Sequence, residues 1–447
     1  MWTSVSASYY KGVMSNGRWL RPRLRSALEK PYVQVLFGAR QTGKTTLLRD
    51  LIPEPDLWID LSEPGQRSAY LIRPQTFVEE CLALPAGGRR RQVVVDEAQA
   101  VPALFDAIQH LYDRDKHRFR FVLSGSSARK LRLTGANLLP GRSLLHHLYP
   151  LTLSERPGVP VGPAIEAIFP LEADPAAPPG PADAADAADA ADAADAADPG
   201  PPFPPAGIVE RLAFGELPGI ALAPEEDREG LLRAYAYAFL EEELRREGLI
   251  KDWPAFARFL ELAARTSGQM VNYARLAKDA GVSAPTVKSH FQLLEDMFIG
   301  FRVGALSGSP RKHVLSTPRF FFFDLGVRHA AARLSNNADT VLADPGPLFE
   351  QWVGIELWKR LQYLGRGSLS YYRTKAGAEV DFVVEYGDRL IPIEAKWTEN
   401  PTLDDARHLR GFLDENRTRA KMGYVVCRCQ RPRLLAENLT ALPWWAL

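Results

Sequence analysis

Hydrophobic residues in the first third of the chain form short continuous runs, which alternate with stretches whose apolar residues recur at helical spacing. Continuous apolar strands separated by helices are typical of a parallel sheet covered on both faces. A ligand then binds at the carboxyl ends of the strands. The expected strands are Val33–Phe37, Leu57–Asp60, Gln92–Val95 and Phe119–Leu123, and the expected helices are Lys44–Leu51, Thr76–Leu84 and Leu104–Tyr112.

Residues 155–207 have a different composition, dominated by Ala, Asp and Pro. Aspartate recurs at every third position from Asp183 to Asp198. This period fits neither a strand nor a heptad and leaves no apolar stripe, so nothing drives the segment to dock. We expect a dispensable insertion, either disordered or forming a solvated helix.

The segment after the insertion has helical periodicity. Ser283 is a suitable N-cap for a helix with Pro285 in its first turn, and the preceding turn at Gly281 gives helix-turn-helix spacing. We expect a helical lid over 208–252 and a winged-helix-like module over 253–310, with 298–303 as the wing. The expected helices are Leu231–Glu247, Ala255–Thr266, Tyr273–Ala280 and Ala284–Met297.

The pattern changes again in the last quarter of the chain, which predicts a separate mixed α/β unit over 311–447. An amphipathic helix precedes several short apolar strands. The expected helices are Leu348–Leu364 and Leu403–Asp414, and the expected strands are Ser368–Arg373, Glu379–Glu385, Leu390–Trp397 and Tyr424–Cys429.

Composition limits the functional classes only slightly. The chain has 447 residues, 46% of them hydrophobic, and a formal net charge of +1. Such a charge neither favours nor excludes DNA. Three cysteines form neither a disulfide framework nor a zinc set, and no uncharged apolar stretch reaches the length of a membrane span. We expect a soluble, cytoplasmic protein without a membrane partner.

The apolar run Val33–Phe37 leads directly into Gly38–Thr45, which fits the phosphate-binding pattern G-x-x-x-x-G-K-[ST]. Glycines allow the backbone N–H groups to face a phosphate, and the start of a helix adds a favourable field. We expect ATP and Mg²⁺ as cofactors, with Lys44 on the β- and γ-phosphates and Thr45 on the metal. The predicted cradle is Gly38, Ala39, Arg40, Gln41, Thr42, Gly43, Lys44, Thr45 and Thr46.

Two carboxylates end a neighbouring apolar strand, about fifty positions after the phosphate loop. Asp96 is predicted to orient the Mg²⁺ shell, and Glu97 to polarise the attacking water. Ser126, after the next strand, is the preferred γ-phosphate contact. A positive group for the transition state is still required, and Arg129 and Arg142 are candidates for supplying it from a neighbouring subunit.

These residues resemble a family. Gly38-Ala39-Arg40-Gln41-Thr42-Gly43-Lys44-Thr45-Thr46, Val95-Asp96-Glu97-Ala98-Gln99, Leu123-Ser124-Gly125-Ser126-Ser127, and Pro140-Gly141-Arg142-Ser143 with Tyr149-Pro150-Leu151 are similar to prokaryotic AAA+ ATPases that carry a C-terminal DUF4143 domain. The resemblance implies an α/β fold with a P-loop AAA+ core over 1–154, in a homo-oligomeric ring. It favours Arg142 as the trigger arginine; a surface salt bridge is the alternative.

The C-terminal unit contains a second acidic pattern. A two-residue turn at Gly387-Asp388 would place Asp381 opposite Glu394 and Glu379 opposite Lys396 on one sheet face. This spacing resembles PD-(D/E)-x-K nucleases, whose carboxylates bind Mg²⁺, and Glu350 matches their helical acid. The implied C-terminal domain is restriction-endonuclease-like. An ordinary ion pair between Glu379 and Lys396 is the alternative, and the fold can survive without cleavage activity.

DNA is the expected partner of the C-terminal half. Polar residues on the second helix of the winged-helix-like module suit phosphates and base edges, although such modules also bind proteins. The predicted function is an ATP-hydrolysing protein that engages DNA; the alternatives are a nucleotide-dependent protein-interaction switch and an ATP-gated, Mg²⁺-dependent nuclease. The basic and polar residues concerned are Lys288, Ser289, His290, Gln292, Arg311, Lys312 and His313, with Arg18, Arg21, Arg23 and Arg25 as a second cluster.

Overall fold

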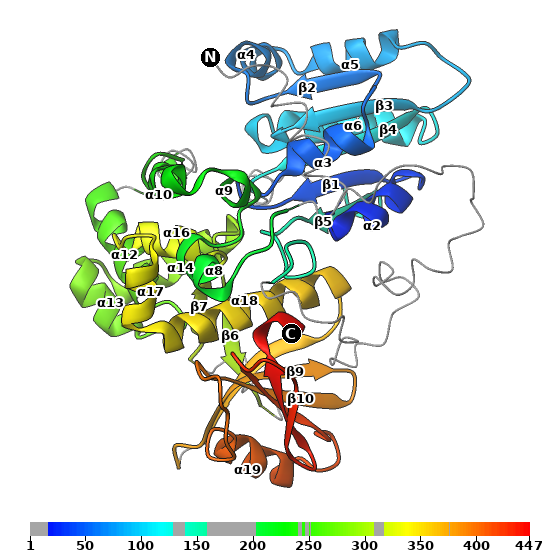
Figure 1. The fold of residues 1–447 in the computed structure, drawn as a ribbon. Coiled ribbons are helices and arrows are strands. Elements are labelled where there is room, and N and C mark those ends of the chain that lie inside the picture. Colours follow the sequence, from blue (N-terminus) through cyan, green and yellow to red (C-terminus); the bar gives the residue numbers. More distant parts are fainter. Residues whose placement is uncertain are drawn as a thin grey trace. The chain divides into compact units, whose positions relative to one another are not determined.

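The computed structural model describes residues 17–127, 139–158, 203–239, 244–245, 250, 252–307, 317–374 and 376–447. The chain divides into two compact units. The first holds the described residues up to Tyr149, with Phe203 and Asp296–Phe298, and the second holds the other described residues from Pro150 onward. Figure 1 labels the elements of both units.

The first unit contains a five-stranded sheet in the order β2-β3-β4-β1-β5, and all its neighbouring strands are parallel. This confirms the parallel sheet predicted from the apolar runs. Strand β5, at one edge, was not predicted. The strands are β1 Val33–Phe37, β2 Leu57–Asp60, β3 Arg91–Asp96, β4 Phe119–Gly125 and β5 Ser143–His147, and the helices are α2 Leu20–Leu28, α3 Lys44–Leu51, α4 Pro64–Ile72, α5 Gln75–Ala83, η1 Ala98–Ala100 and α6 Ala103–Arg114.

Strand β1 is buried along its whole length because both faces of the sheet are covered. On one face Val35 and Phe37 join a core that includes Phe77 of α5 and Ile108 of α6. On the other face Gln34 donates from Nε2 to the carbonyl of Ala27 in α2. A central strand enclosed in this way holds the loop that follows its carboxyl end in a fixed position.

The second unit contains an eight-stranded mixed sheet in the order β12-β13-β11-β10-β9-β8-β6-β7. The strand predicted as a wing is β6, and it lies inside this sheet, antiparallel to β7 and parallel to β8. The strands are β6 Gly300–Ala305, β7 Arg319–Phe322, β8 Ser368–Arg373, β9 Glu379–Tyr386, β10 Arg389–Ala395, β11 Gly423–Cys427, β12 Arg433–Ala436 and β13 Leu439–Pro443.

Two helices pack on opposite faces of this sheet. Helix α18, Pro345–Leu364, approaches Phe382 closely at Gly354, where a Cβ would lie 2.6 Å from the ring. Helix α19, Arg407–Glu415, packs against Val383, the next residue along β9, through Leu409 and Phe412. Because successive side chains of a strand point to opposite faces, Phe382 and Val383 anchor one helix each.

The rest of the second unit is largely helical. The helices expected at 255–266, 273–280 and 284–297 are present within one or two residues as α12, α13 and α14. A turn of π-helix, η3, lies within the helix expected at 231–247. The helices are α8 Ile208–Phe214, α9 Pro218–Leu222, α10 Glu225–Ala234, η3 Tyr235–Phe239, α12 Trp253–Arg265, α13 Tyr273–Ala280, α14 Ala284–Asp296, α16 Leu325–Ala331, α17 Ala338–Ala343 and, at the C-terminus, η4 Trp444–Ala446.

The ends of the predicted insertion, 155–207, belong to the ordered structure. Arg156 is 1% exposed and pairs with Glu210 at 2.5 Å and with Glu216 at 3.4 Å. Gly158 and Ala206 form a parallel bridge. The boundaries predicted from composition are therefore too wide, because the tertiary contacts of these residues leave no compositional signal. The Asp-Ala-Ala repeat lies outside the described residues.

Two sequence expectations about chemistry can be compared with the described residues. Cys81, Cys427 and Cys429 are buried and form no disulfide. In the part of the chain that the structure describes, no helix has the length and apolar content needed to cross a membrane.

Candidate functional site

The phosphate loop joins β1 to α3 and has the backbone that its two glycines require. A Cβ on Gly38 would lie 2.2 Å from the carbonyl oxygen of Leu148, and Gly43 has φ +91° at the N-cap of α3. No side chain caps this helix start. The Lys44 Nζ donates to the carbonyls of Gly38 at 2.9 Å and Ala39 at 3.0 Å. The loop therefore presents a helix N-terminus and a lysine together, a combination that suits an anion.

Arg18 stabilises this loop from outside the motif. The side chain is 3% exposed and donates to the carbonyls of Thr42 and Tyr149, each at 2.6 Å. The predicted role of Arg18 as part of a basic DNA-binding cluster is therefore wrong, because its guanidinium is buried against backbone oxygens. Its sequence position gave no signal of this contact, since Tyr149 lies 131 residues away.

Asp96 lies at the carboxyl end of β3, beside the phosphate loop. Its Oδ2 accepts a hydrogen bond from Thr45 Oγ1 at 2.7 Å. Its Oδ1 accepts from Ser124 Oγ and from the Glu97 N–H. Asp96 is 3% exposed, and all of these donors are neutral. The structure thus brings together the hydroxyl and the carboxylate that the sequence predicted as Mg²⁺ ligands.

Glu97 follows in a backbone conformation rare for a residue with a side chain, at φ +55°. Its Oε2 accepts from Ser126 Oγ at 3.2 Å and from Gln99 Nε2. Gln99 also donates to Ser126 at 3.0 Å, so the three side chains form a closed cluster. Sequence reasoning gave Gln99 no role, although it stood within the Asp-Glu-Ala-Gln motif.

Arg142 lies at the opposite end of the strands from the phosphate loop. Its carbonyl accepts from the N–H of Val33, the first residue of β1, whereas the phosphate loop follows the last. At about 3.3 Å per strand residue, the two ends of β1 are roughly 13 Å apart. The side chain pairs with Asp113 at 2.5 Å and 3.0 Å, as in the salt-bridge alternative. Arg129, the other candidate, lies outside the described residues.

The second acidic centre, in β9 and β10, has the predicted register. Ile393 faces Phe382 and Arg389 faces Tyr386 across the turn at Gly387. Beyond the last pair, the N–H of Asp381 donates to Glu394 at 3.4 Å, and Asp381 Oδ2 accepts from the Ala395 N–H at 2.9 Å. Burial and the neighbouring Asp381 raise the pKa of Glu394 to about 10. Two adjacent carboxyl groups in this setting disfavour ionisation of both.

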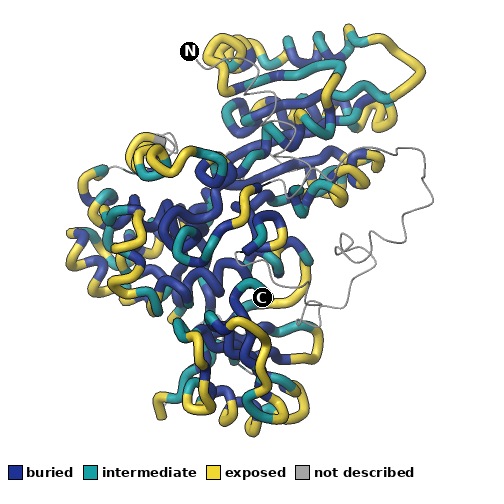
Figure 2. The backbone as a smooth tube through the Cα atoms, in the orientation of Figure 1, coloured by how far each residue is buried: buried dark blue, intermediate teal, exposed yellow. Residues whose placement is uncertain are grey.

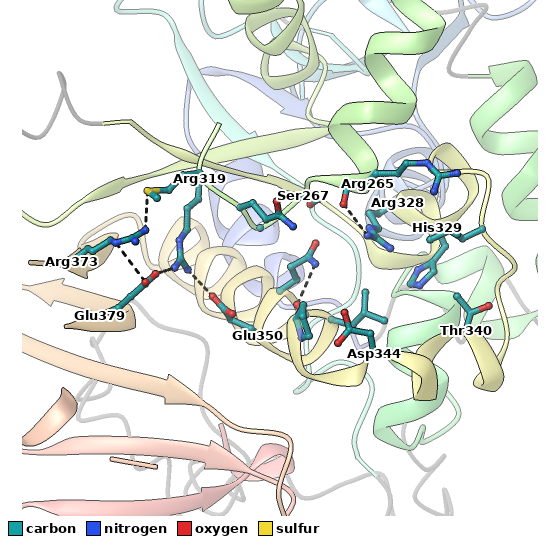
Figure 3. A pocket seen from close by; sticks show the side chains of 17 residues that line it. Arg265, Ser267, Arg319, Arg328, His329, Thr340, Asp344, Glu350, Arg373 and Glu379 are labelled. Atoms are coloured by element: carbon teal, nitrogen blue, oxygen red, sulfur yellow. Dashed lines mark hydrogen bonds and ion pairs between the residues drawn. The ribbon is translucent and has the colours of Figure 1, made fainter. Parts of the chain in front are cut away.

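Two cations of the chain already neutralise this centre. Lys396 lies 3.6 Å from Glu394 and 3.9 Å from Asp381, and not in the ion pair with Glu379 that was the alternative to a metal site. Glu379 instead pairs with Arg319, which also contacts Glu350 at 2.6 Å (Figure 3). Sequence reasoning missed Arg319 entirely.

The pKa of Glu350 rises to about 7 because burial and Asp381 outweigh Arg319. Glu350 therefore belongs to the same electrostatic cluster as Asp381, as the sequence predicted. Among the described residues, no group of three or more His, Cys, Asp or Glu side chains has the geometry of a metal site. The carboxylates are close together, yet in this arrangement they do not fit a Mg²⁺ ion.

The helix-turn-helix part of the second unit exposes a polar face on α14. Lys288, Ser289 and Gln292 are exposed, with Lys288 Nζ 5.3 Å from the centre of the Tyr273 ring. His290, expected on the same face, packs between Phe256 and Phe259 at 4.8 Å and 4.9 Å. Burial lowers the pKa of His290. Arg311, Lys312 and His313 lie outside the described residues.

Comparison with protein families supports the division of the chain. Residues 30–156 match a family model described as an AAA domain. The chain contains an AAA domain. Residues 206–338 and 345–447 match two domains of unknown function, DUF8612 and DUF4143. The DUF4143 model thus begins at 345, not at the predicted boundary of 311, and one model covers both the predicted lid and the winged-helix-like module.

The relatives of the AAA-domain chain have no described function. An uncharacterized protein of Mycobacterium tuberculosis is 26% identical over 88% of this chain and 76% of its own length. An uncharacterized protein of Haemophilus influenzae is 20% identical over 86% of this chain and 87% of its own. The crystal structure of a Vibrio cholerae protein aligns with 91% of this chain and 90% of its own chain at 12% identity. The TM-score of 0.16 is too low to indicate a shared fold.

Proposed function

We propose that this protein is a Mg²⁺-dependent ATPase whose catalytic residues are Lys44, Thr45, Asp96 and Glu97. The observation that carries the proposal is the 2.7 Å contact between Thr45 and Asp96 at the mouth of the phosphate loop. A hydroxyl and a carboxylate with only neutral donors around them suit a hard divalent cation. The AAA domain over 30–156 supports nucleotide binding in general terms.

In this proposal each residue of the chain has a separate task. Lys44 leaves its two carbonyl contacts and binds the β- and γ-phosphates, while the N–H groups of the loop orient the triphosphate. Thr45 and Asp96 hold Mg²⁺, which supplies charge neutralisation when bound. Glu97 accepts the proton of the attacking water once it is released from Gln99 and Ser126. The closed cluster of these three side chains is therefore a resting arrangement.

The transition-state cation would come from a neighbouring copy of the chain. Arg142 lies at the opposite end of the strands from its own phosphate loop. It can therefore act only if a second subunit places its own Arg142 beside this phosphate loop. A homo-oligomeric ring would supply such a subunit. Arg142 would exchange Asp113 for the γ-phosphate, and an exposed ion pair of that kind is weak enough to exchange.

Calorimetric titration with ATP and Mg²⁺ tests the nucleotide site. We expect K44A to abolish binding, because the lysine carries the main charge on the phosphates. We expect E97Q to retain binding while turnover falls about a hundredfold or more, the usual contribution of a general base. The matched control K116A removes an exposed lysine and should change neither value. Normal turnover in both K44A and E97Q would refute the proposal.

We further propose that the second unit engages DNA through the exposed face of α14. Lys288, Ser289 and Gln292 supply one charge and two hydrogen-bonding groups on a single helix face. A salt-sensitive mobility shift of a labelled duplex is the expected result, weakened by K288E and unchanged by K421E, which alters an exposed lysine near α19. Absence of any shift would favour the alternative, a protein-interaction switch. Because Arg319 and Lys396 already neutralise the second acidic centre, a DNA-binding role fits this unit better than a nuclease role.

A further inference from the structure

A pocket of about 500 Å³ lies within the second unit, beside the acidic centre (Figure 3). Its wall comes from the end of α12, from β7, α16 and α17, and from the start of α18. This volume is in the range of sites that bind small organic ligands. Four arginines line it against three acidic residues: Arg265, Arg319, Arg328 and Arg373 face Asp344, Glu350 and Glu379. Arg265 is also paired with Glu261 at 3.1 Å, so the least balanced cation of the lining is Arg328.

Arg328 is the pocket arginine that is most weakly balanced, because the charge of Asp344 acts on it without forming an ion pair. It is 9% exposed, and within the described part of the chain it forms no ion pair. Its Nε donates to the carbonyl of Ala264 at 2.8 Å and its Nη2 to that of Arg265 at 3.5 Å. Burial and the nearby Arg265 lower its pKa to about 10, against the opposing charge of Asp344. A buried guanidinium without a carboxylate is costly unless an anion reaches it.

Two buried acceptors on the same wall also lack partners among the described residues. His329 is fully buried, and its Nδ1 lies 2.7 Å from the Leu325 carbonyl. Since a carbonyl only accepts, Nδ1 carries the proton and the unpartnered Nε2 is an acceptor. Gln351 is 3% exposed; its Nε2 donates to the Pro347 carbonyl at 3.2 Å, and its Oε1 is unpartnered.

The pocket therefore suits an anion that also carries hydrogen-bond donors. Burial lowers the pKa of His329 to about 4, so this ring does not add a further positive charge near neutral pH. The four arginines of the lining disfavour an ammonium group as the donor, which argues against zwitterions such as amino acids. Hydroxyl groups remain. A phosphate monoester carries nearly two negative charges at neutral pH and accepts bidentate bonds from arginine.

We propose that this pocket binds the phosphate of a phosphorylated sugar, with Arg328 and Arg265 on the phosphate and with His329 and Gln351 accepting from sugar hydroxyls. The same chemistry occurs in a free sugar phosphate or mononucleotide and in the 5′-phosphorylated end of a nucleic-acid strand. The inference does not depend on the proposed ATPase, because every residue that carries it lies in the second unit.

Calorimetry of the full chain with ribose 5-phosphate tests the proposal. We expect R328Q to weaken binding at least tenfold, because a charge-assisted hydrogen bond is lost. R265Q alters a half-exposed residue that also pairs with Glu261 at 3.1 Å, and it should weaken binding several-fold. R275Q removes an exposed arginine outside the pocket and should have no effect. K44A should also leave ribose 5-phosphate binding intact, which separates this pocket from the phosphate loop.

A comparison of ligands tests whether the bound phosphate belongs to a free sugar phosphate or to a strand end, and whether a phosphorylated sugar is the right chemical class. Inorganic phosphate should bind more weakly than ribose 5-phosphate, since it cannot satisfy His329 and Gln351. Tighter binding of a 5′-phosphorylated hexanucleotide than of its 5′-hydroxyl form, lost in R328Q, would assign the pocket to strand ends; otherwise the free sugar phosphate is the ligand. No binding of either, full binding by R328Q and R265Q when both remain folded, or equal binding of citrate would overturn the proposal.

Discussion

Both acidic centres of this protein consist of Asp and Glu side chains, but their electrostatic settings are opposite. Around Asp96 and Glu97 the hydrogen-bond partners are hydroxyl, amide and backbone N–H groups, all neutral. Around the C-terminal carboxylates the partners are Arg319 and Lys396. A centre whose negative charge the chain leaves unbalanced is suited to an external cation, whereas one that the chain balances can exist without it. Clustering of carboxylates alone therefore does not identify a metal site.

The largest expected effect concerns the first centre. Asp96→Asn keeps the size of the side chain but removes the charge that would hold Mg²⁺, so we expect ATP turnover to fall about a thousandfold, equivalent to about 4 kcal/mol. Steady-state phosphate release measures it. Asp381→Asn is the matched change in the second centre and should leave turnover unaltered. Equal losses in the two variants would contradict the contrast between the centres.

The second effect concerns the cation that the chain provides. Arg319 is 7% exposed and pairs with Glu350 and Glu379, so R319Q leaves Glu350 without this partner and Glu379 with the more distant Arg373. Breaking such a buried pair costs about 3–5 kcal/mol in the free energy of unfolding. Urea denaturation measures the loss, and we expect added Mn²⁺ to restore part of it. R373Q, which alters a half-exposed arginine 3.9 Å from Glu379, is the control.

If R319Q unfolds at the same urea concentration as R373Q, Arg319 is not what balances this centre. If R319Q is unstable but Mn²⁺ has no effect, the carboxylates are balanced by arginine yet cannot hold a metal in its place. The first result would remove the contrast between the two centres. The second would mean that the centres differ in how their charge is stabilised, but that the second cannot bind a metal even without Arg319.

Local motifs made the first centre predictable from sequence, whereas the balance of the second depends on residues far apart. The phosphate loop lies within eight consecutive residues, and Asp96 ends an apolar strand whose parallel neighbours are fixed by burial. The β9–β10 register also followed from its turn. Arg319, in contrast, lies 31 residues from Glu350 and 60 from Glu379, and no periodicity marks it. The same limit explains β6, whose parallel partner Ser370 lies far along the chain from Gly304.

A third effect isolates a buried carboxylate that the chain balances fully. Glu356 is 1% exposed; burial alone would raise its pKa, but Lys359, Arg360 and the Leu153 N–H lower it to about 2. Because the pKa is lower in the folded state than in the unfolded state, this stabilisation is present above about pH 4.5 and is lost as the pH falls toward 2. The shift corresponds to about 3 kcal/mol.

Chemical denaturation at pH 5 and pH 3 measures this loss. In E356Q the pH dependence between these values should be smaller, because the titrating group is absent, and the protein should already be less stable at pH 7 with Lys359 left unpaired. An unchanged difference between pH 5 and pH 3 in E356Q would show that other carboxylates cause the acid sensitivity.

The smallest expected effect has the opposite sign and tests the proton in the second centre. Since the pKa of Glu394 is raised in the folded state, its contribution to stability is complete below about pH 4.5 and is lost as the pH rises toward 10. E394Q resembles the protonated form and cannot lose it, so the variant should match the wild type near pH 4.5 and exceed it by at least about 1 kcal/mol at pH 7. Denaturation at the two pH values decides. A variant that is less stable than the wild type at pH 7 would mean that Glu394 is ionised, and the second centre would then carry the unbalanced charge that distinguishes the first.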